Sequence, residues 1–193
     1  MFDLWLVLTS LYKTFKMDPK QFGVLKGMGI GAICSILIIF AGVKYNPLGF
    51  ASDITMENRV KLALKSCLIP ALCLAISIGR LASLRFFSPK DIDGSSSSST
   101  GTSQATILQS IIQNTLEQSV LATIVYLAWS VLMPGSWLSV VRLASFAFGI
   151  GRLLFTIGYG YGAPSRAMGF ALTFYSSVGM LLCLIFSCVT SKI

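Results

Sequence analysis

Five apolar stretches, each about long enough to cross a bilayer, constrain this chain more than any other feature of its sequence. A membrane-spanning helix needs about 20 mostly apolar residues. The strands of a membrane β-barrel would instead alternate apolar and polar residues over segments of about 10, and these stretches do not alternate. The sequence therefore predicts an all-α, polytopic membrane bundle with five transmembrane helices. The predicted spans are 23–43, 66–84, 105–133, 137–158 and 167–189.

The composition supports the membrane interpretation and excludes several other classes. Charged residues make up 11% of the chain, against about 25% in soluble domains. Lys and Arg outnumber Asp and Glu by 15 to 7, which in so apolar a chain is typical of loops beside lipid headgroups rather than of nucleic-acid contact. The chain has no His, the commonest metal ligand and general base, and we predict no metal site. We interpret the five Cys, an odd number, as buried thiols.

The segment before the first span is amphipathic. Within residues 1–22, apolar side chains such as Leu4 and Leu8 share one helical face, which favours a helix lying in the membrane interface. The alternative is a partly ordered tail. Asp18 followed by Pro19 predicts that a helix starts there, because Asp caps free backbone amides and Pro suits the first helical position.

The first span differs from the others in its glycines. Gly23, Gly27 and Gly31 recur every four residues within 23–43, and such a stripe lets another helix backbone approach closely in lipid. The alternative is a merely flexible helix. Because this span has almost no ionisable residue, we expect it to pack outside the other four. Residues 94–104 are rich in Ser and predict a flexible polar linker outside the bilayer.

Polar and ionisable residues inside spans mark a candidate site, because they are costly in a bilayer unless paired or wetted. Glu117 and Arg152 could form a purely structural ion pair. The chain, however, offers more Arg than this one carboxylate can neutralise, which favours an anionic ligand bearing carboxylates or phosphate. The candidate residues are Ser110, Gln113, Asn114 and Glu117 on one face of the third span, Arg152, Phe155 and Tyr159 on the fourth, Arg80 at the end of the second and Arg166 at the start of the fifth.

The spacing of these residues predicts that they meet. Glu117 lies 17 residues before Pro134, and Arg152 lies 17 residues after Gly135. If residues 134 and 135 form the turn between two antiparallel helices, the two charged side chains lie at the same depth. We therefore expect Asn114, Glu117, Arg152, Tyr159 and Arg166 to converge near the membrane face that carries the turn at 160–165.

At these residues the chain resembles the MAPEG family, the membrane-associated proteins in eicosanoid and glutathione metabolism. The run from Ser110 to Glu117 is similar to the family's Arg-x-x-x-Asn-x-x-Glu pattern, with Ser in place of Arg. The run from Arg152 to Tyr159, followed by Arg166, is similar to its third-helix pattern. Arg80, followed by Phe86-Phe87 and a Pro-acid run, is similar to the end of its first helix. The resemblance covers about residues 60–190, a four-helix unit.

The resemblance implies a homotrimer that binds glutathione, folded into a U shape, between neighbouring subunits. Arg152 and Arg80 would meet the carboxylates of glutathione, Glu117 its ammonium group, and Asn114 would orient it. Arg166 or Tyr159 would then stabilise the thiolate as catalytic groups. The implied activity is a glutathione-dependent transferase or peroxidase acting on an apolar small molecule or lipid held in a cleft facing the bilayer.

Three departures leave a second function open. Ser110 replaces a family Arg, Phe155 stands where many members have Tyr or His, and the span at 23–43 is additional. Five spans resemble the mattrin-like branch of the family, which implies a non-catalytic membrane adaptor in secretory traffic or receptor regulation, with other membrane proteins as partners. A third possible function is a transporter or channel. The sequence shows neither the internal repeat nor the broken helices that would favour it.

The resemblance also implies a membrane of the endoplasmic reticulum or Golgi. Counting basic residues outside the bilayer gives eight on the side of the N-terminus and six on the other side. By the positive-inside rule, this excess predicts a cytosolic N-terminus.

Overall fold

The protein is a bundle of long helices, seen in a computed structural model that describes residues 17–93 and 102–190. The predicted interfacial segment lies largely outside the described residues, as does most of the predicted linker at 94–104. Five of the helices are long and apolar enough to cross a membrane, which confirms the predicted all-α membrane bundle. The elements are α2 (Pro19–Lys44), α3 (Met56–Phe87), α4 (Ser103–Leu132), η1 (Gly135–Trp137), α5 (Ser139–Gly158), η2 (Tyr159–Tyr161) and α6 (Ala163–Thr190).

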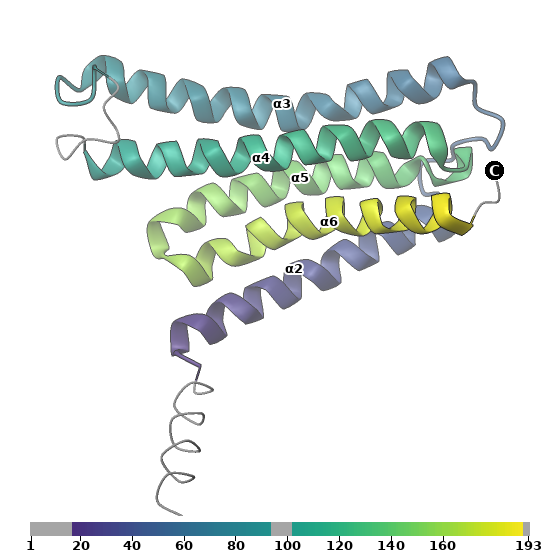
Figure 1. The fold of residues 1–193 in the computed structure, drawn as a ribbon, viewed down its shortest axis with the longest axis horizontal. Helices are drawn as coiled ribbons and strands as arrows, with labels where there is room; N and C mark the ends of the chain where they lie inside the picture. Colours follow the sequence, from purple (N-terminus) through teal and green to yellow (C-terminus); the bar gives the residue numbers. More distant parts are fainter. Residues whose placement is uncertain (1–16, 94–101, 191–193) are drawn as a thin grey trace, which may run out of the picture.

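Four of the helices form a closed unit, and α2 lies beside it (Figure 1). Around that unit α3 packs on α4, α4 on α6, α6 on α5, and α5 on α3. The core between α4, α5 and α6 is built on large buried side chains, among them Trp129, Tyr126 and Phe148. Helix α2 runs along α6 and also touches α5. The additional span is thus an outer layer on α6.

The outer surface of the bundle is apolar. Large side chains such as Ile36, Leu68 and Phe186 are each about two thirds exposed, an arrangement suited to lipid rather than water. The chain is an integral membrane protein. All five cysteines are free, as expected, but none is fully buried, and Cys183 and Cys188 are exposed. Our interpretation of them as buried thiols is therefore wrong. The physical reason is that a small apolar thiol is tolerated on a surface that faces lipid.

Helix α2 begins and packs as its sequence predicts. Asp18 caps it, and the Gln21 side chain accepts a hydrogen bond from the Asp18 backbone N–H at 3.0 Å, completing a capping box. The glycine stripe lies against α6. A Cβ added at Gly31 would stand 2.5 Å from Ala171 Cβ, so only glycine permits this approach. Both the predicted helix start and the predicted close packing are confirmed.

A proline inside α3 is compensated by a side chain from α5. Pro70 has no N–H to donate to the carbonyl four residues earlier, that of Ser66. The Ser145 hydroxyl donates to this Ser66 carbonyl at 2.6 Å, and all three residues are buried. A bilayer offers no water to freed carbonyls. The bond between α3 and α5 therefore lets the helix continue through Pro70.

The hairpin of α5 and α6 brings their two backbones together. Gly162 turns the chain with φ 94°, a value that favours glycine. Further along, a Cβ at Gly169 would clash with the Phe155 backbone nitrogen and stand 2.6 Å from the Gly151 carbonyl. The close crossing fixes the end of α5 against the start of α6, and hence the relative positions of the candidate residues that the two helices carry.

A carboxylate joins the segment after α3 to the start of α4. Asp91, only 3% exposed, accepts hydrogen bonds from the Ser88 hydroxyl at 2.6 Å and from the Thr102 backbone N–H at 2.8 Å. These donors, that of Ser88 most of all, lower the pKa of Asp91 below its ordinary value of 3.8. The Thr102 hydroxyl meanwhile caps α4. The two ends of the linker are therefore held together by a charged acceptor.

Candidate functional site

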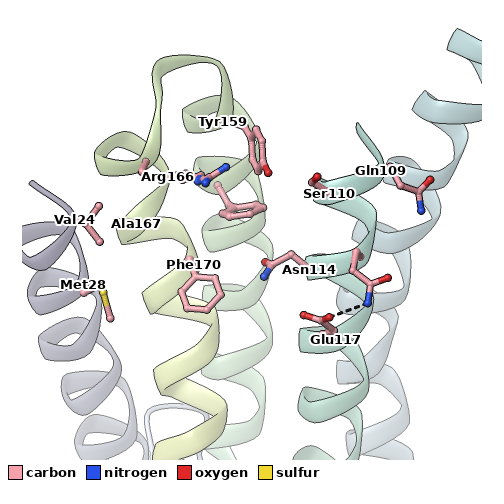
Figure 2. A pocket seen from close by; sticks show the side chains of 13 residues that line it. Val24, Met28, Gln109, Ser110, Asn114, Glu117, Tyr159, Arg166, Ala167 and Phe170 are labelled. Carbon is pink, nitrogen blue, oxygen red and sulfur yellow. Dashed lines mark hydrogen bonds between the residues drawn. The ribbon is translucent and has the colours of Figure 1, made fainter. Parts of the chain in front are cut away.

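A pocket of about 710 Å³ lies in the groove between α4 and α6. Its floor is the end of α5, and part of its side is α2 (Figure 2). Helix α4 contributes Gln109, Ser110, Gln113, Asn114 and Glu117. The other helices contribute Phe155, Tyr159, Ala163, Arg166, Ala167, Phe170, Val24 and Met28.

Polar side chains are gathered on the α4 side of this pocket. Glu117 accepts a hydrogen bond from Gln113 Nε2 at 2.8 Å, the contact drawn in Figure 2. Both side chains are exposed in the single chain, although they lie within a helix long and apolar enough to cross a membrane. The Ser110 hydroxyl donates back to the Thr106 carbonyl at 3.0 Å, so it needs no external partner. The carboxylate of Glu117 is the principal anionic group that the pocket presents.

On the opposite side, a cation lies over an aromatic ring. Arg166 Cζ is 4.1 Å from the centre of the Tyr159 ring, a cation–π contact that holds the guanidinium at the mouth of the pocket. Arg166 comes from the first turns of α6 and Tyr159 from the start of η2, so the tight turn at Gly162 brings them together. The pocket thus has a carboxylate on α4 and a guanidinium on α6.

Arg152 lies next to the pocket, inside the protein. The residue is 3% exposed. It donates to Asn114 Oδ1 at 2.8 Å, to Thr173 Oγ1 at 2.9 Å and to Gln118 Oε1 at 3.3 Å. Its Cζ also lies 4.4 Å from the centre of the Phe155 ring. Arg152 is therefore a buried cation held by three neutral acceptors from α4 and α6, and Asn114 connects it to the pocket.

The ion pair considered from the sequence is not formed within this chain. Arg152 and Glu117, both in the described ranges, share no salt bridge, since Arg152 bonds to Asn114 instead and Glu117 turns to Gln113. Among the described residues, Arg152 Nε and Gln118 Nε2 have no hydrogen-bond partner. The charge on Arg152 thus depends on dipoles and ring faces.

The structure separates the predicted site residues into groups. Asn114, Glu117, Tyr159 and Arg166 line the one pocket. Arg152 lies behind Asn114 and reaches a smaller cavity of about 330 Å³ between α3 and α5, which Arg80 also lines. Arg80 is exposed and takes no part in the larger pocket of its own chain.

Sequence reasoning did not identify two sets of residues at this site. Gln118 and Thr173 hold Arg152. Gln118, four residues after Asn114, could have been placed on the same helical face. Val24 and Met28 line the pocket from α2. Each follows a glycine of the stripe by one residue, and this spacing would have placed them beside whichever helix the stripe contacts.

Comparison with known proteins gives one match. The model of the MAPEG family matches residues 62–186, which covers α4 and α5 and most of α3 and α6 but leaves α2 outside. No curated protein and no solved structure matches the chain.

Proposed function

The chain belongs to the MAPEG family, and on that basis we propose that it binds glutathione, or a similar anionic thiol, in the pocket between α4 and α6. The observation that carries the proposal is the placement of Glu117 and Arg166 on opposite sides of one pocket of about 710 Å³. Glutathione has an ammonium group at one end and carboxylates at both ends. A site with one fixed anion and one fixed cation complements such a zwitterion.

In this proposal each pocket residue has a distinct task. Glu117 pairs with the ammonium group, and Asn114 hydrogen-bonds the peptide portion. Arg166 or Tyr159 stabilises the thiolate, because a nearby cation or phenol donor lowers a thiol pKa and the thiolate is the reactive form. Arg152 is a positioning residue, since its contact with ligand runs through Asn114, to which it donates at 2.8 Å. The thiolate would then form a carbon–sulfur bond with the electrophilic carbon of an apolar substrate, while the bond from that carbon to its leaving group breaks and the leaving group departs as an anion.

We further propose that the working unit is a homotrimer. Glu117 and Gln113 are exposed on a membrane helix of the single chain, and charged side chains facing lipid cost about 2.5–3.5 kcal/mol each on insertion scales. A neighbouring copy that covers this face of α4 removes the cost and closes the open side of the pocket. Arg80, exposed on α3, is then free to approach the pocket of a neighbouring copy. Native mass spectrometry in mild detergent should show trimers, and monomers alone would contradict this.

One observation favours the second candidate function, a mattrin-like adaptor without catalysis. Ser110 occupies a position where the family has Arg, and its hydroxyl is satisfied by its own helix. The pocket therefore has one cation fewer for a thiolate or carboxylate. On the other hand, the glycine stripe that would suit a receptor helix is already covered by α6. The endoplasmic reticulum or Golgi membrane remains the proposed location under both functions.

Glutathione binding separates the two candidates. Isothermal titration of the detergent-purified protein should give saturable binding that Glu117→Gln weakens about 10-fold or more, since a hydrogen bond to a charged group contributes about 1.5–3 kcal/mol. Glu57→Gln is the matched control, because Glu57 is an exposed carboxylate on α3, away from the pocket, and pairs with Lys61 of the same helix. Absence of binding to the parent protein would overturn the proposal and favour the adaptor.

A further inference from the structure

The pocket has an apolar side to which the additional helix contributes. Val24 and Met28 of α2 line it together with Ala163, Ala167 and Phe170 of α6. Figure 2 shows the side chains of Val24 and Met28 on α2, on the side of α6 away from α4. Both are half-buried, whereas Leu25 and Ile33 on the same helix are 54% and 60% exposed. The two pocket residues therefore lie on the protein-facing side of α2.

The position of this wall is fixed by contacts that tolerate little movement. A Cβ at Gly27 would stand 3.0 Å from Ala167 Cβ, and Ala167 is itself a pocket residue. Further along, the Ser176 hydroxyl donates to Ser35 Oγ at 3.1 Å, and the Ser35 hydroxyl donates to the Gly31 carbonyl at 2.8 Å. Backbone contact and buried hydrogen bonds thus hold α2 at one distance from α6, and that distance sets the width of the pocket beside Met28.

The two sides of the pocket suit the two ends of one ligand. The α4 side carries amides and a carboxylate, while the α2 side carries aliphatic and thioether groups. A polar thiol held by Glu117 and Arg166 would place whatever is attached to its sulfur near the aromatic and aliphatic residues. Hydrocarbon attached there would leave water or lipid for a wall of fixed shape.

We infer that α2 is the specificity wall of this site, and that Val24 and Met28 select the size of the hydrocarbon group that the thiol ligand carries or receives on its sulfur. The inference rests on the proposed function, because the polar end of the ligand must be held for its apolar end to be placed. It goes further by giving the additional span, which lies outside the matched region 62–186, a part in ligand selection.

The test compares thioethers of glutathione that differ only in the length of the alkyl group. In the parent protein S-hexylglutathione should bind more tightly than S-methylglutathione, by up to about fourfold per buried methylene. In Met28→Trp the larger side chain occupies the pocket space beside α2. The hexyl-to-methyl affinity ratio should therefore fall about 10-fold or more, the equivalent of two buried methylenes. Met28→Ala enlarges the space, so it should raise the affinity for a branched or benzyl thioether relative to the methyl derivative.

A matched control uses the lipid-facing side of the same helix. Ile33→Trp adds the same side chain to α2 away from the pocket, and its ratio should equal that of the parent. If the thioethers bind but the ratio is the same in Met28→Trp, Met28→Ala and the parent, the wall is refuted while the proposed function stands. If neither glutathione nor any thioether binds the parent protein, the proposed function fails, and the inference fails with it.

Discussion

Adding one methyl group to the glycine stripe should separate α2 from α6, and Gly31→Ala is the sharpest such change. The new Cβ would stand 2.5 Å from Ala171 Cβ and 2.9 Å from the Leu172 backbone nitrogen. Neither neighbour is the flexible end of a side chain, so the helices must move apart. Gly29 lies on the same helix with nothing within 4 Å of its added Cβ, which makes Gly29→Ala the matched control.

The expected changes in the free energy of unfolding have opposite signs at Gly29 and Gly31. Replacing Gly by Ala in a helix gains up to about 1 kcal/mol in helix propensity, and Gly29→Ala should show that gain alone. At Gly31 overpacking costs about 1–3 kcal/mol, and separation of the helices also weakens the hydrogen bond of Ser176 to Ser35, worth about 1 kcal/mol. Gly31→Ala should therefore lower the free energy of unfolding by about 1–3 kcal/mol.

Thermal unfolding in detergent, followed by tryptophan fluorescence, measures the difference. A change of 1 kcal/mol corresponds to about 2–4 °C for a chain of this size, so Gly31→Ala should unfold about 2–12 °C below the parent and Gly29→Ala at or slightly above it. Equal unfolding temperatures for the two variants would refute the close packing of α2 on α6.

Three further predictions test the buried cation, the linker and the mouth of the pocket. Arg152→Lys should lower the free energy of unfolding by about 2 kcal/mol or more, measured by the same melt, because one ammonium group cannot reach the three acceptors that the guanidinium holds; an unchanged melt would contradict the buried network. Because the pKa of Asp91 in the folded chain lies below its ordinary 3.8, its stabilisation is complete above pH 3.8 and is lost as the pH falls through the lower, folded value. Asp91→Asn should remove that acid-dependent loss from a profile of unfolding temperature against pH, and an identical profile would count against the contact with Thr102. Tyr159→Phe keeps the ring beneath Arg166 and should leave the unfolding temperature close to that of the parent, yet it should raise the thiol pKa of bound glutathione, read from the ultraviolet absorption of the thiolate as the pH is varied; an unchanged thiol pKa would remove the phenol from the site.

The elements that local sequence determines could be predicted closely. The Asp18–Pro19 start of α2 follows from capping alone, and the glycines at four-residue spacing indicated a helix contact before any partner was known. The partner itself could not be predicted, because the stripe specifies close approach but not which of four apolar helices approaches. The residue opposite Gly31, Ala171, is as small and apolar as many others in the chain.

The candidate site could be predicted less completely, because the depth of a residue in the bilayer does not tell in which direction its side chain points. Equal residue counts placed Glu117 and Arg152 at one depth, but they could not tell that Arg152 points into the bundle while Glu117 points out of it. The cause is the neutral acceptors Asn114, Gln118 and Thr173, which come from two helices and converge only in the folded chain. Equal depth in the sequence therefore suggested a contact between Glu117 and Arg152 that the folded chain does not make.

A cryo-electron microscopy map of the detergent-purified protein with saturating glutathione tests most directly whether glutathione binds between α4 and α6. We expect a trimer with ligand density in the groove between α4 and α6, within hydrogen-bonding distance of Glu117 and Arg166 and closed on its open side by a neighbouring copy. Density for glutathione elsewhere, or a groove filled by the neighbouring copy's own side chains with no room for a ligand, would contradict it.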